Sequence, residues 1–246
     1  CRLLTYALNG NADFMGDDIH YASNHDFVGI EFSIHGMLDG RVRVGMPGKF
    51  NADNALAALA VCTLALSGGS GVLDDHTKQA ILGSLVKVRV DGRMEIAHVS
   101  KKCSVIVDYA HNAVSMESLL TTLRDYHPKR LVCVFGCGGN RARDRRYSMG
   151  EIGGKMADLC IITADNPRFE KNEDIIKDIE VGLAKTDGTY LVIPDRREAI
   201  FYAIRNAEEG DMIAIIGKGH EDYQEIEGVK HHFLDREVVE EAVNNV

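Results

Sequence analysis

The sequence lacks the long apolar segments of membrane and secreted proteins. No apolar run approaches the roughly 18 residues that a helix needs to cross a bilayer, which argues against a transmembrane protein. The first six residues also lack the apolar core of a signal peptide. With 45% hydrophobic and 26% charged residues among 246, the composition is that of a globular protein. Because the chain begins with Cys1 rather than methionine, we expect it to start within a longer protein.

Basic residues are fewer than acidic residues in this sequence. Lysine and arginine number 28 against 37 aspartates and glutamates, which gives a net charge of −9. Duplex nucleic acid is bound by a basic surface, so no nucleic-acid partner is expected. Small anionic ligands remain compatible with this composition wherever arginines gather locally.

Cysteine pairs with metal-binding spacing are also missing. None of the six cysteines forms a Cys-x-x-Cys pair, and most lie in apolar segments, as Cys62 and Cys160 do. Cys133 and Cys137 are four residues apart, on a predicted strand and the turn after it. This usage is typical of reduced thiols in a cytoplasmic protein. We therefore predict no zinc site, no disulfide framework and no other metal ligands.

A complete phosphate-binding loop is absent from the sequence. The Walker A pattern requires Gly-x-x-x-x-Gly-Lys followed by Ser or Thr. The sequence has two Gly-Lys pairs, but Lys49 is followed by Phe50 and Lys218 by Gly219. We therefore expect neither ATP hydrolysis nor ligase activity from this chain alone.

The first 90 residues are β-rich and then helical. Short apolar runs separated by turn residues predict strands at 1–8, 27–34 and 41–46. The Ala- and Leu-rich residues 51–66 predict a buried helix with Asn51 or Asp53 near its start, and residues 74–85 predict a shorter helix. Residues 86–91 have the character of a hinge, so we place a domain boundary after residue 90.

Residues 91–246 alternate between strands and helices. Runs typical of strands buried on both faces occupy 93–99, 104–108, 131–135, 159–163, 190–193 and 212–216. Helices are predicted at 115–126, 148–157, 172–185 and 195–207, then a hairpin at 223–233 and a helix at 235–244 capped by Asp235. This alternation predicts an α/β fold with a Rossmann-like, mostly parallel sheet, whose ligands bind at the carboxyl ends of the strands.

Two loops that follow predicted strands carry groups suited to anions or sugars. The Asp108 carboxylate at a strand end can accept ribose hydroxyls; alternatively, Asp108 or Asn112 caps the next helix. Residues 136–146 combine a glycine-rich turn with four arginines, whose guanidinium forks suit carboxylate or phosphate unless they are merely solvated. Because Arg141 occupies the sixth position of Gly-x-Gly-x-x-Gly, the dinucleotide fingerprint fails, which disfavours an oxidoreductase.

Two further loops suit a zwitterionic ligand. Residues 165–168, Asp-Asn-Pro-Arg, place an acceptor, an amide and a cation on one rigid turn; the alternative is an Asx-Pro turn with a surface arginine. Residues 217–221 offer two glycines for close backbone approach and Glu221 as an acceptor for an amine. The alternative is a flexible turn with incidental charges.

Taken in order, five segments resemble the motifs of the Mur ligases of bacterial peptidoglycan synthesis. They are residues 48–58, 92–95, 108–112, the loop from residue 136, and 217–221. The tetrad at 165–168 is similar to the motif with which one branch of this family selects meso-diaminopimelate. Ala113 and the Arg145-Arg146-Tyr147 segment depart from the usual family residues, which affects loop geometry and not the resemblance.

The resemblance implies ATP-dependent amide-bond formation. In the family, ATP activates the D-glutamate carboxylate of UDP-N-acetylmuramoyl-L-Ala-D-Glu as an acyl phosphate, which the amine of the incoming amino acid attacks. Residues 1–90 resemble the end of the central ATPase domain, and residues 91–246 resemble the C-terminal amino-acid-binding domain. The P-loop, the Mg²⁺ ligands and the catalytic groups are accordingly expected before Cys1, with none in this chain.

The resemblance also divides the candidate site residues between two ligands. For ATP they are Asn54, Arg93, Asp108 and His111; for diaminopimelate they are Arg141, Asp165, Asn166, Pro167, Arg168, Gly217 and Glu221. The charges agree, because arginines can serve two carboxylates while Asp165 and Glu221 serve two ammonium groups. The alternatives are a lysine-adding or folylpolyglutamate-type ligase, or an amino-acid-binding module without catalysis.

Overall fold

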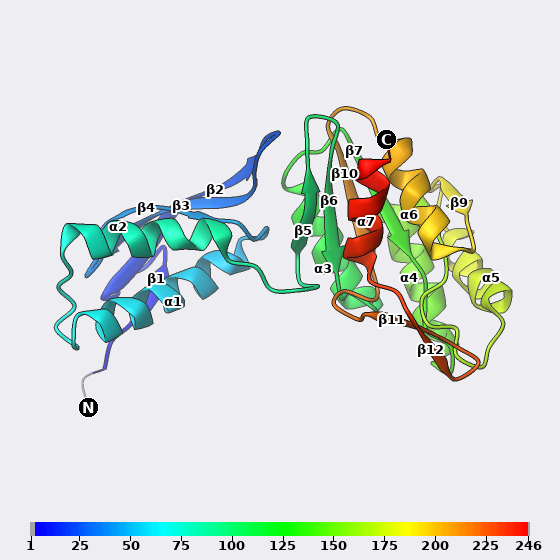
Figure 1. Cartoon of the computed structure of the whole chain (residues 1–246), viewed down its shortest axis with the longest axis horizontal. Helices are drawn as coiled ribbons and strands as arrows, with labels where there is room; N and C mark the ends of the chain where they lie inside the picture. The colour runs from blue at the N-terminus through cyan, green and yellow to red at the C-terminus, as the bar shows by residue number, and fades with distance from the viewer. Residues whose placement is uncertain (1–2, 246) are drawn as a thin grey trace. The chain divides into compact units, whose positions relative to one another are not determined.

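The computed structural model describes residues 3–245 and divides the chain into two compact units (Figure 1). One unit extends to Arg89 and the other begins at Val90, whereas the sequence patterns predict a boundary between residues 90 and 91. Each unit has its own hydrophobic core. The match of either unit to a particular ligase domain stays a prediction.

The first unit is a four-stranded sheet with helices packed on it. Its strands, in spatial order, are β1 (Tyr6–Leu8), β2 (Phe14–Ser23), β3 (Val28–Gly36) and β4 (Gly40–Val44). Only β1 and β2 pair in parallel. The helices are α1 (Phe50–Leu66) and α2 (Asp75–Ser84), followed by a 3-10 turn, Leu85–Lys87. Alternate residues of β3, including Phe32 and Ile34, share a core with Leu56 and Leu59 of α1.

Strand β2 is absent from the sequence-based prediction. Asp17, Asp18 and His20 break the alternation of apolar residues, and the register with β3 shifts between Asp17 and His20. The long pairing with β3 holds this polar segment in the sheet, which no local pattern reveals. The first strand begins at Tyr6 rather than at residue 1, and the first two residues lie outside the described part of the chain.

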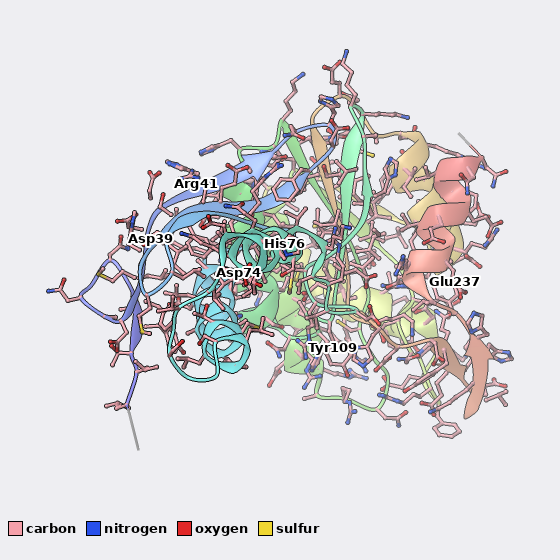
Figure 2. The ribbon with its side chains drawn as sticks, turned by 60° about the vertical axis from the view of Figure 1, so that its left-hand side comes forward. Asp39, Arg41, Asp74, His76, Tyr109 and Glu237 are labelled. Atoms are coloured by element: carbon pink, nitrogen blue, oxygen red, sulfur yellow. The ribbon has the colours of Figure 1, made fainter. Side chains whose placement is uncertain are left out.

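The two helices of this unit begin differently. The N-cap of α1 is Lys49, which makes no capping side-chain hydrogen bond, while Asn51 Nδ2 donates to the Pro47 carbonyl at 2.7 Å. In contrast, Asp74, which is labelled in Figure 2, caps α2 by accepting from the Thr77 backbone N–H at 2.9 Å. The expectation that Asn51 lies near the start of α1 is therefore correct, although its side chain acts on the preceding loop.

The second unit is built on a six-stranded sheet with the order β5-β6-β10-β7-β8-β9. These strands are β5 (Glu95–Val99), β6 (Cys103–Asp108), β7 (Arg130–Phe135), β8 (Leu159–Ile162), β9 (Tyr190–Val192) and β10 (Asp211–Ile216). All neighbouring pairs are parallel except β5 with β6. The predicted Rossmann-like, mostly parallel sheet is thereby confirmed. A separate hairpin joins β11 (Tyr223–Ile226) to β12 (Val229–His232), as predicted.

Helices cover both faces of this sheet (Figure 1). Every residue of β6 and β10 is buried, as expected for strands with a helix layer on each side. On one face, α6 (Arg196–Arg205) and α7 (Asp235–Asn244) pack against Val105, Val134 and Ile213. The helices α3 (Ala113–Arg124), α4 (Arg143–Met156) and α5 (Asn172–Leu183) form the other layer, where Gly153 of α4 fits closely against Phe135.

The start of α4 and the cap of α7 differ from the prediction. Helix α4 begins at Arg143 rather than at Ser148, because its first turn consists of charged residues that resemble a solvated loop. Asp235 is the first residue of α7 and not its cap; the N-cap is Leu234. The Asp235 carboxylate is instead fully buried against Arg196, which explains why it does not face the backbone N–H groups of its own helix.

Strand β10 lies between β6 and β7, although it is the last of the parallel strands in sequence. The loops that follow β6, β7, β8 and β10 consequently meet at one edge of the sheet. The Gly217 N–H, just after β10, donates to the carbonyl of Asp108 at the end of β6. This edge brings together the four loops that the sequence singles out.

Candidate functional site

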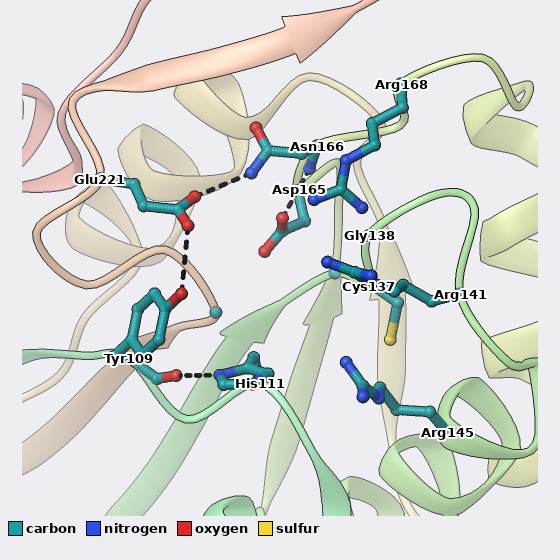
Figure 3. A pocket seen from close by; sticks show the side chains of 12 residues that line it. Tyr109, His111, Cys137, Gly138, Arg141, Arg145, Asp165, Asn166, Arg168 and Glu221 are labelled. Carbon is teal, nitrogen blue, oxygen red and sulfur yellow. Dashed lines mark hydrogen bonds between the residues drawn. The ribbon is translucent and has the colours of Figure 1, made fainter.

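A cavity of about 360 Å³ opens at the carboxyl ends of these strands (Figure 3). Four loops contribute its lining, which consists of Tyr109, His111, Gly136, Cys137, Gly138, Arg141, Arg145, Asp165, Asn166, Arg168, Gly217 and Glu221. Carboxylates lie toward one side and guanidinium groups face them from the other (Figure 3).

Most residues predicted to hold an amino acid line this cavity. Only Pro167 among them does not, and it lines a second cavity on the other side of its loop. Of the residues predicted for ATP, His111 also lines the first cavity, whereas Arg93 and Asp108 lie outside its lining. Asn54 is an exposed residue of α1 in the first unit.

The Glu221 carboxylate is held from two sides. Its Oε1 accepts a hydrogen bond from the Tyr109 hydroxyl at 3.3 Å, and its Oε2 accepts one from Asn166 Nδ2 at 2.8 Å (Figure 3). The two donors come from the loops after β6 and β8. Because separate loops hold both oxygens, the carboxylate is oriented before any ligand arrives, which lowers the entropic cost of binding.

Asp165 provides a second, more deeply buried carboxylate. It is 7% exposed, and its Oδ1 accepts from the backbone N–H of Asn166 at 2.6 Å. Burial raises the pKa of Asp165, while the charges of Arg196 and Lys218 lower it. Gly217 has a φ of +114°, and a Cβ there would lie 2.5 Å from Asp165 Oδ2, so this approach requires glycine.

Three arginines supply the positive side of the cavity. Arg168 is already engaged, because its Nη1 donates to the Gly139 carbonyl at 2.7 Å and its Nε lies 3.4 Å from Glu225 Oε2. Arg141 and Arg145 form no ion pair with any residue in the range 3–245. Their forks are therefore available for a carboxylate or phosphate of a ligand.

The loop that carries Arg168 is braced by its neighbours. Arg168 has a φ of +54°, its N–H donates to the Glu225 carbonyl, and its own carbonyl accepts from the Glu227 N–H. On the other side, a Cβ on Gly139 would lie 1.9 Å from the Pro167 carbonyl oxygen. The tetrad thus sits between the glycine-rich turn and the hairpin, which limits its motion.

The Asp108 and Asn112 side chains form hydrogen bonds to backbone groups of the protein itself. Its two carboxylate oxygens accept from the N–H groups of Met94 and Ala110 at 2.8 and 2.7 Å, and burial raises its pKa. Asn112 caps α3 in a capping box with Ser115, as the alternative reading of this loop anticipated. A role for Asp108 in binding ribose stays a prediction.

Tyr109 connects the remaining nucleotide candidates to the cavity. The Arg93 guanidinium lies 5.0 Å from the centroid of its ring, and His111 Nδ1 is hydrogen-bonded to its carbonyl at 2.8 Å. Its hydroxyl reaches Glu221, and burial is the main cause that raises its pKa. One aromatic side chain therefore contacts both groups of predicted ligand-binding residues.

Tyr109 and Arg145 line the cavity but are not among the predicted site residues, although both belong to loops that the sequence singles out. Tyr109 directly follows the strand-end Asp108, which is the signal that could have identified it. Arg145 was hidden because α4 begins earlier than expected, which places this residue in its first turn. Its neighbour Arg146 points elsewhere, being 1% exposed and ion-paired with Glu170 and Asp178.

Cys137 lines the cavity without being a nucleophile. Burial raises the pKa of its thiol to about 12, and its Sγ contacts Met149 Sδ at 3.7 Å. A thiol in this state has almost no reactive thiolate at neutral pH. Within residues 3–245, no group of three or more His, Cys, Asp or Glu side chains could hold a metal ion, and no helix could cross a bilayer.

Comparison with known proteins gives consistent similarities. Residues 92–219 match the family described as Mur ligase, glutamate ligase domain. The chain is 41% identical over 242 residues to the UDP-N-acetylmuramoyl-L-alanyl-D-glutamate–2,6-diaminopimelate ligase of Clostridioides difficile (strain 630), covering 98% of this chain and 48% of that protein. The enzyme with the same description from Aquifex aeolicus (strain VF5) is 42% identical over 236 residues, covering 96% of this chain and 44% of the relative.

Solved structures agree with these sequence similarities. A structure of a UDP-N-acetylmuramoyl-L-alanyl-D-glutamate–2,6-diaminopimelate ligase superposes with a TM-score of 0.75 at 35% identity, covering 98% of this chain and 47% of that one. A folylpolyglutamate synthase from Thermotoga maritima has a TM-score of 0.56 at 23% identity over 82% of this chain and 43% of its own, which shows a shared fold alone. The chain spans about half the length of the curated relatives it matches.

Proposed function

The chain belongs to the Mur ligase family, and we propose that its second unit binds meso-diaminopimelate as part of an ATP-dependent ligase. The whole protein would join this amino acid to UDP-N-acetylmuramoyl-L-alanyl-D-glutamate, in the cytoplasm. The observation that carries the proposal is the charge pattern of the cavity. Two carboxylates, Asp165 and Glu221, oppose three arginines around a space of about 360 Å³.

Diaminopimelate matches this pattern group by group. It carries two ammonium groups, which Asp165 and Glu221 would accept, and two carboxylates, which Arg141, Arg145 and Arg168 would bind. Gly217 lets the backbone approach the ligand beside Asp165. Lysine lacks the distal carboxylate, so a guanidinium that faces that position would gain no partner from the ligand in the lysine complex, and the affinity would be lower.

The role of this unit in the reaction would be positioning. A carboxylate activated as an acyl phosphate is attacked by the amine of the amino acid, and holding that amine in line is worth up to roughly 7–11 kcal/mol of barrier. ATP and Mg²⁺ supply the activation. Asn54, Arg93, Asp108 and His111 are proposed to contact the nucleotide, and residues 1–90 to belong to the ATPase domain. The sequence contains no Walker A motif, so we assign no phosphate-transfer step to this chain.

Binding measured on the 246-residue chain tests the proposal without requiring catalysis. Resonances of ¹⁵N-labelled protein would be followed by NMR during titration with meso-diaminopimelate, L-lysine and L-glutamate. We expect diaminopimelate to shift signals from the cavity loops and to bind at least tenfold more tightly than lysine, in line with a charge-assisted hydrogen bond. Equal binding of lysine, or preferred binding of glutamate, would point to another branch of the family and refute the assignment.

A further inference from the structure

A fully buried lysine belongs to the loop that contributes Gly217 and Glu221 to the cavity lining. Lys218 is 0% exposed, follows β10 between Gly217 and Gly219, and does not line the cavity itself. Removing an ammonium group from water costs several kcal/mol unless nearby groups compensate it. The contacts of Lys218 show which groups compensate for the burial of its charge.

These contacts tie the cavity wall to the hairpin. Lys218 Nζ donates to the carbonyl of Tyr223, at the start of β11, and lies 3.7 Å from Glu221 Oε2. The Glu221 N–H donates to the Lys218 carbonyl at 2.9 Å and closes a turn. The ammonium group thus lies within ion-pair distance of the same carboxylate that accepts hydrogen bonds from Tyr109 and Asn166.

The charges of the five ionisable side chains at and around Lys218 do not balance. Arg196 is committed to Asp235 through two hydrogen bonds of 2.7 Å, and it also donates to the carbonyls of Ala164 and Ile216. Lys218 Nζ lies within ion-pair distance of Glu221, and the charges of Arg196 and Lys218 both lower the pKa of Asp165. The five side chains therefore carry one more negative than positive charge when all are ionised.

We propose that Lys218 is a positioning residue for the amine-binding half of the cavity. It holds the Glu221 carboxylate in place, and it offsets only part of the negative charge around it, so that the ammonium group of the amino acid is the cation that completes the set. The proposal rests on the proposed function. It assigns Lys218 no contact with the substrate.

The pH dependence of binding gives this role a distinctive readout. The charged groups that face Lys218 are Asp165, Glu221, Arg196 and Asp235, and Lys218 is among the causes that lower the pKa of Asp165. Removal of its charge therefore raises the pKa of Asp165. Only ionised Asp165 attracts an ammonium group. As the pH falls, a variant without the Lys218 charge would therefore lose binding at a higher pH than the unsubstituted chain.

Lys218→Met removes the charge and keeps the length of the side chain, and Lys230→Met is the matched control. Lys230 also lies over the Tyr223 ring, at 3.9 Å, but belongs to an exposed strand. In NMR titrations with meso-diaminopimelate between pH 5.5 and 8.5, we expect Lys218→Met to bind roughly tenfold more weakly at pH 7.5, as for loss of a charge-assisted contact. We also expect this variant to lose binding at a higher pH than the unsubstituted chain when the pH is lowered; this loss is the acid limb of the binding profile. Lys230→Met should match the unsubstituted chain.

Two further measurements separate positioning from a general effect on stability. In Lys218→Met combined with Glu221→Gln, the losses of affinity should not add, because both act on one carboxylate. If Lys218→Met fails to fold, ¹⁵N signals of the lysine side chains in the unsubstituted chain carry the test. The buried Lys218 ammonium should exchange slowly and shift when diaminopimelate binds.

The outcomes distinguish this inference from the proposed function. If the unsubstituted chain bound no amino acid, the proposed function itself would fail. If it bound diaminopimelate, and Lys218→Met left both the affinity and the acid limb unchanged, only the role of Lys218 would be refuted. A Lys218 signal that does not respond to bound diaminopimelate would refute it as well.

Discussion

Arg168 offers the sharpest test of amino-acid selection. Its guanidinium lines the cavity, and we expect it to pair with the distal carboxylate of diaminopimelate, the group that lysine lacks. Truncating a hydrogen-bonded charge pair costs about 2–4 kcal/mol of affinity. Arg168→Ala should therefore weaken diaminopimelate binding more than lysine binding.

The internal contacts of Arg168 place the effect at the low end of this range. Glu225 Oε2 lies 3.4 Å from its Nε and already offsets part of its charge. A ligand carboxylate must compete with that partner, so we expect a loss of about 2 kcal/mol, or roughly thirtyfold. Glu225→Gln removes the competitor from a partly exposed pair and should strengthen binding by at most about 1 kcal/mol.

Calorimetry with diaminopimelate and lysine on both variants would measure these changes, with thermal unfolding recorded in parallel. Arg168→Ala also removes the 2.7 Å hydrogen bond to the Gly139 carbonyl, so some loss of stability is expected. Arg168→Lys should rescue affinity only partly, because an ammonium group cannot present a two-pronged fork. If Arg168→Ala weakened both amino acids equally, the arginine would only brace the loop and the selectivity argument would fail.

Three further outcomes follow from the site. Arg145→Ala should weaken diaminopimelate binding by about 1.5–3 kcal/mol. Arg143→Ala, which removes an exposed side chain outside the cavity, should leave calorimetric affinity unchanged. Asp235→Asn leaves a buried guanidinium unpaired and should lower the free energy of unfolding in urea by about 3–5 kcal/mol, against under about 1 kcal/mol for the exposed Glu241→Gln. Because burial raises the pKa of Asp165, diaminopimelate binding should weaken, as the pH falls, at a higher pH than an ordinary carboxyl group would cause. Asp165→Asn should bind weakly and should lose this pH dependence. If the pH dependence persisted in Asp165→Asn, another group would be responsible for it.

The predictable parts of the fold are those with a local cause. Continuous apolar runs such as β6 and β10 indicate strands buried on both faces, and their alternation with helices indicates a parallel sheet. Strand β2 and the start of α4 were missed because their stability comes from partners distant in sequence. The pairing of β2 with β3 and the ion pairs of Arg146 leave no local pattern.

The site shows the same division. Loops at the carboxyl ends of strands indicated Asp165, Arg168 and Glu221, since parallel strands present those ends at one edge. The sequence patterns did not reveal that Lys218 is wholly buried, because burial depends on the hairpin that folds over it. Local chemistry therefore predicted the lining of the cavity better than its support.

The central place of β10 has a consequence for how the protein is made. Strands β6 and β7 each pair with β10, so both are synthesised before the strand that lies between them. The sheet of a nascent chain that ends before Asp211 lacks its central strand, and the cavity lacks the loop that begins at Gly217. A complete cavity thus arises only after β10 and the loop at Gly217 have been synthesised, and chains terminated before Asp211 would carry an incomplete sheet with unpaired strand edges for chaperones and proteases to recognise.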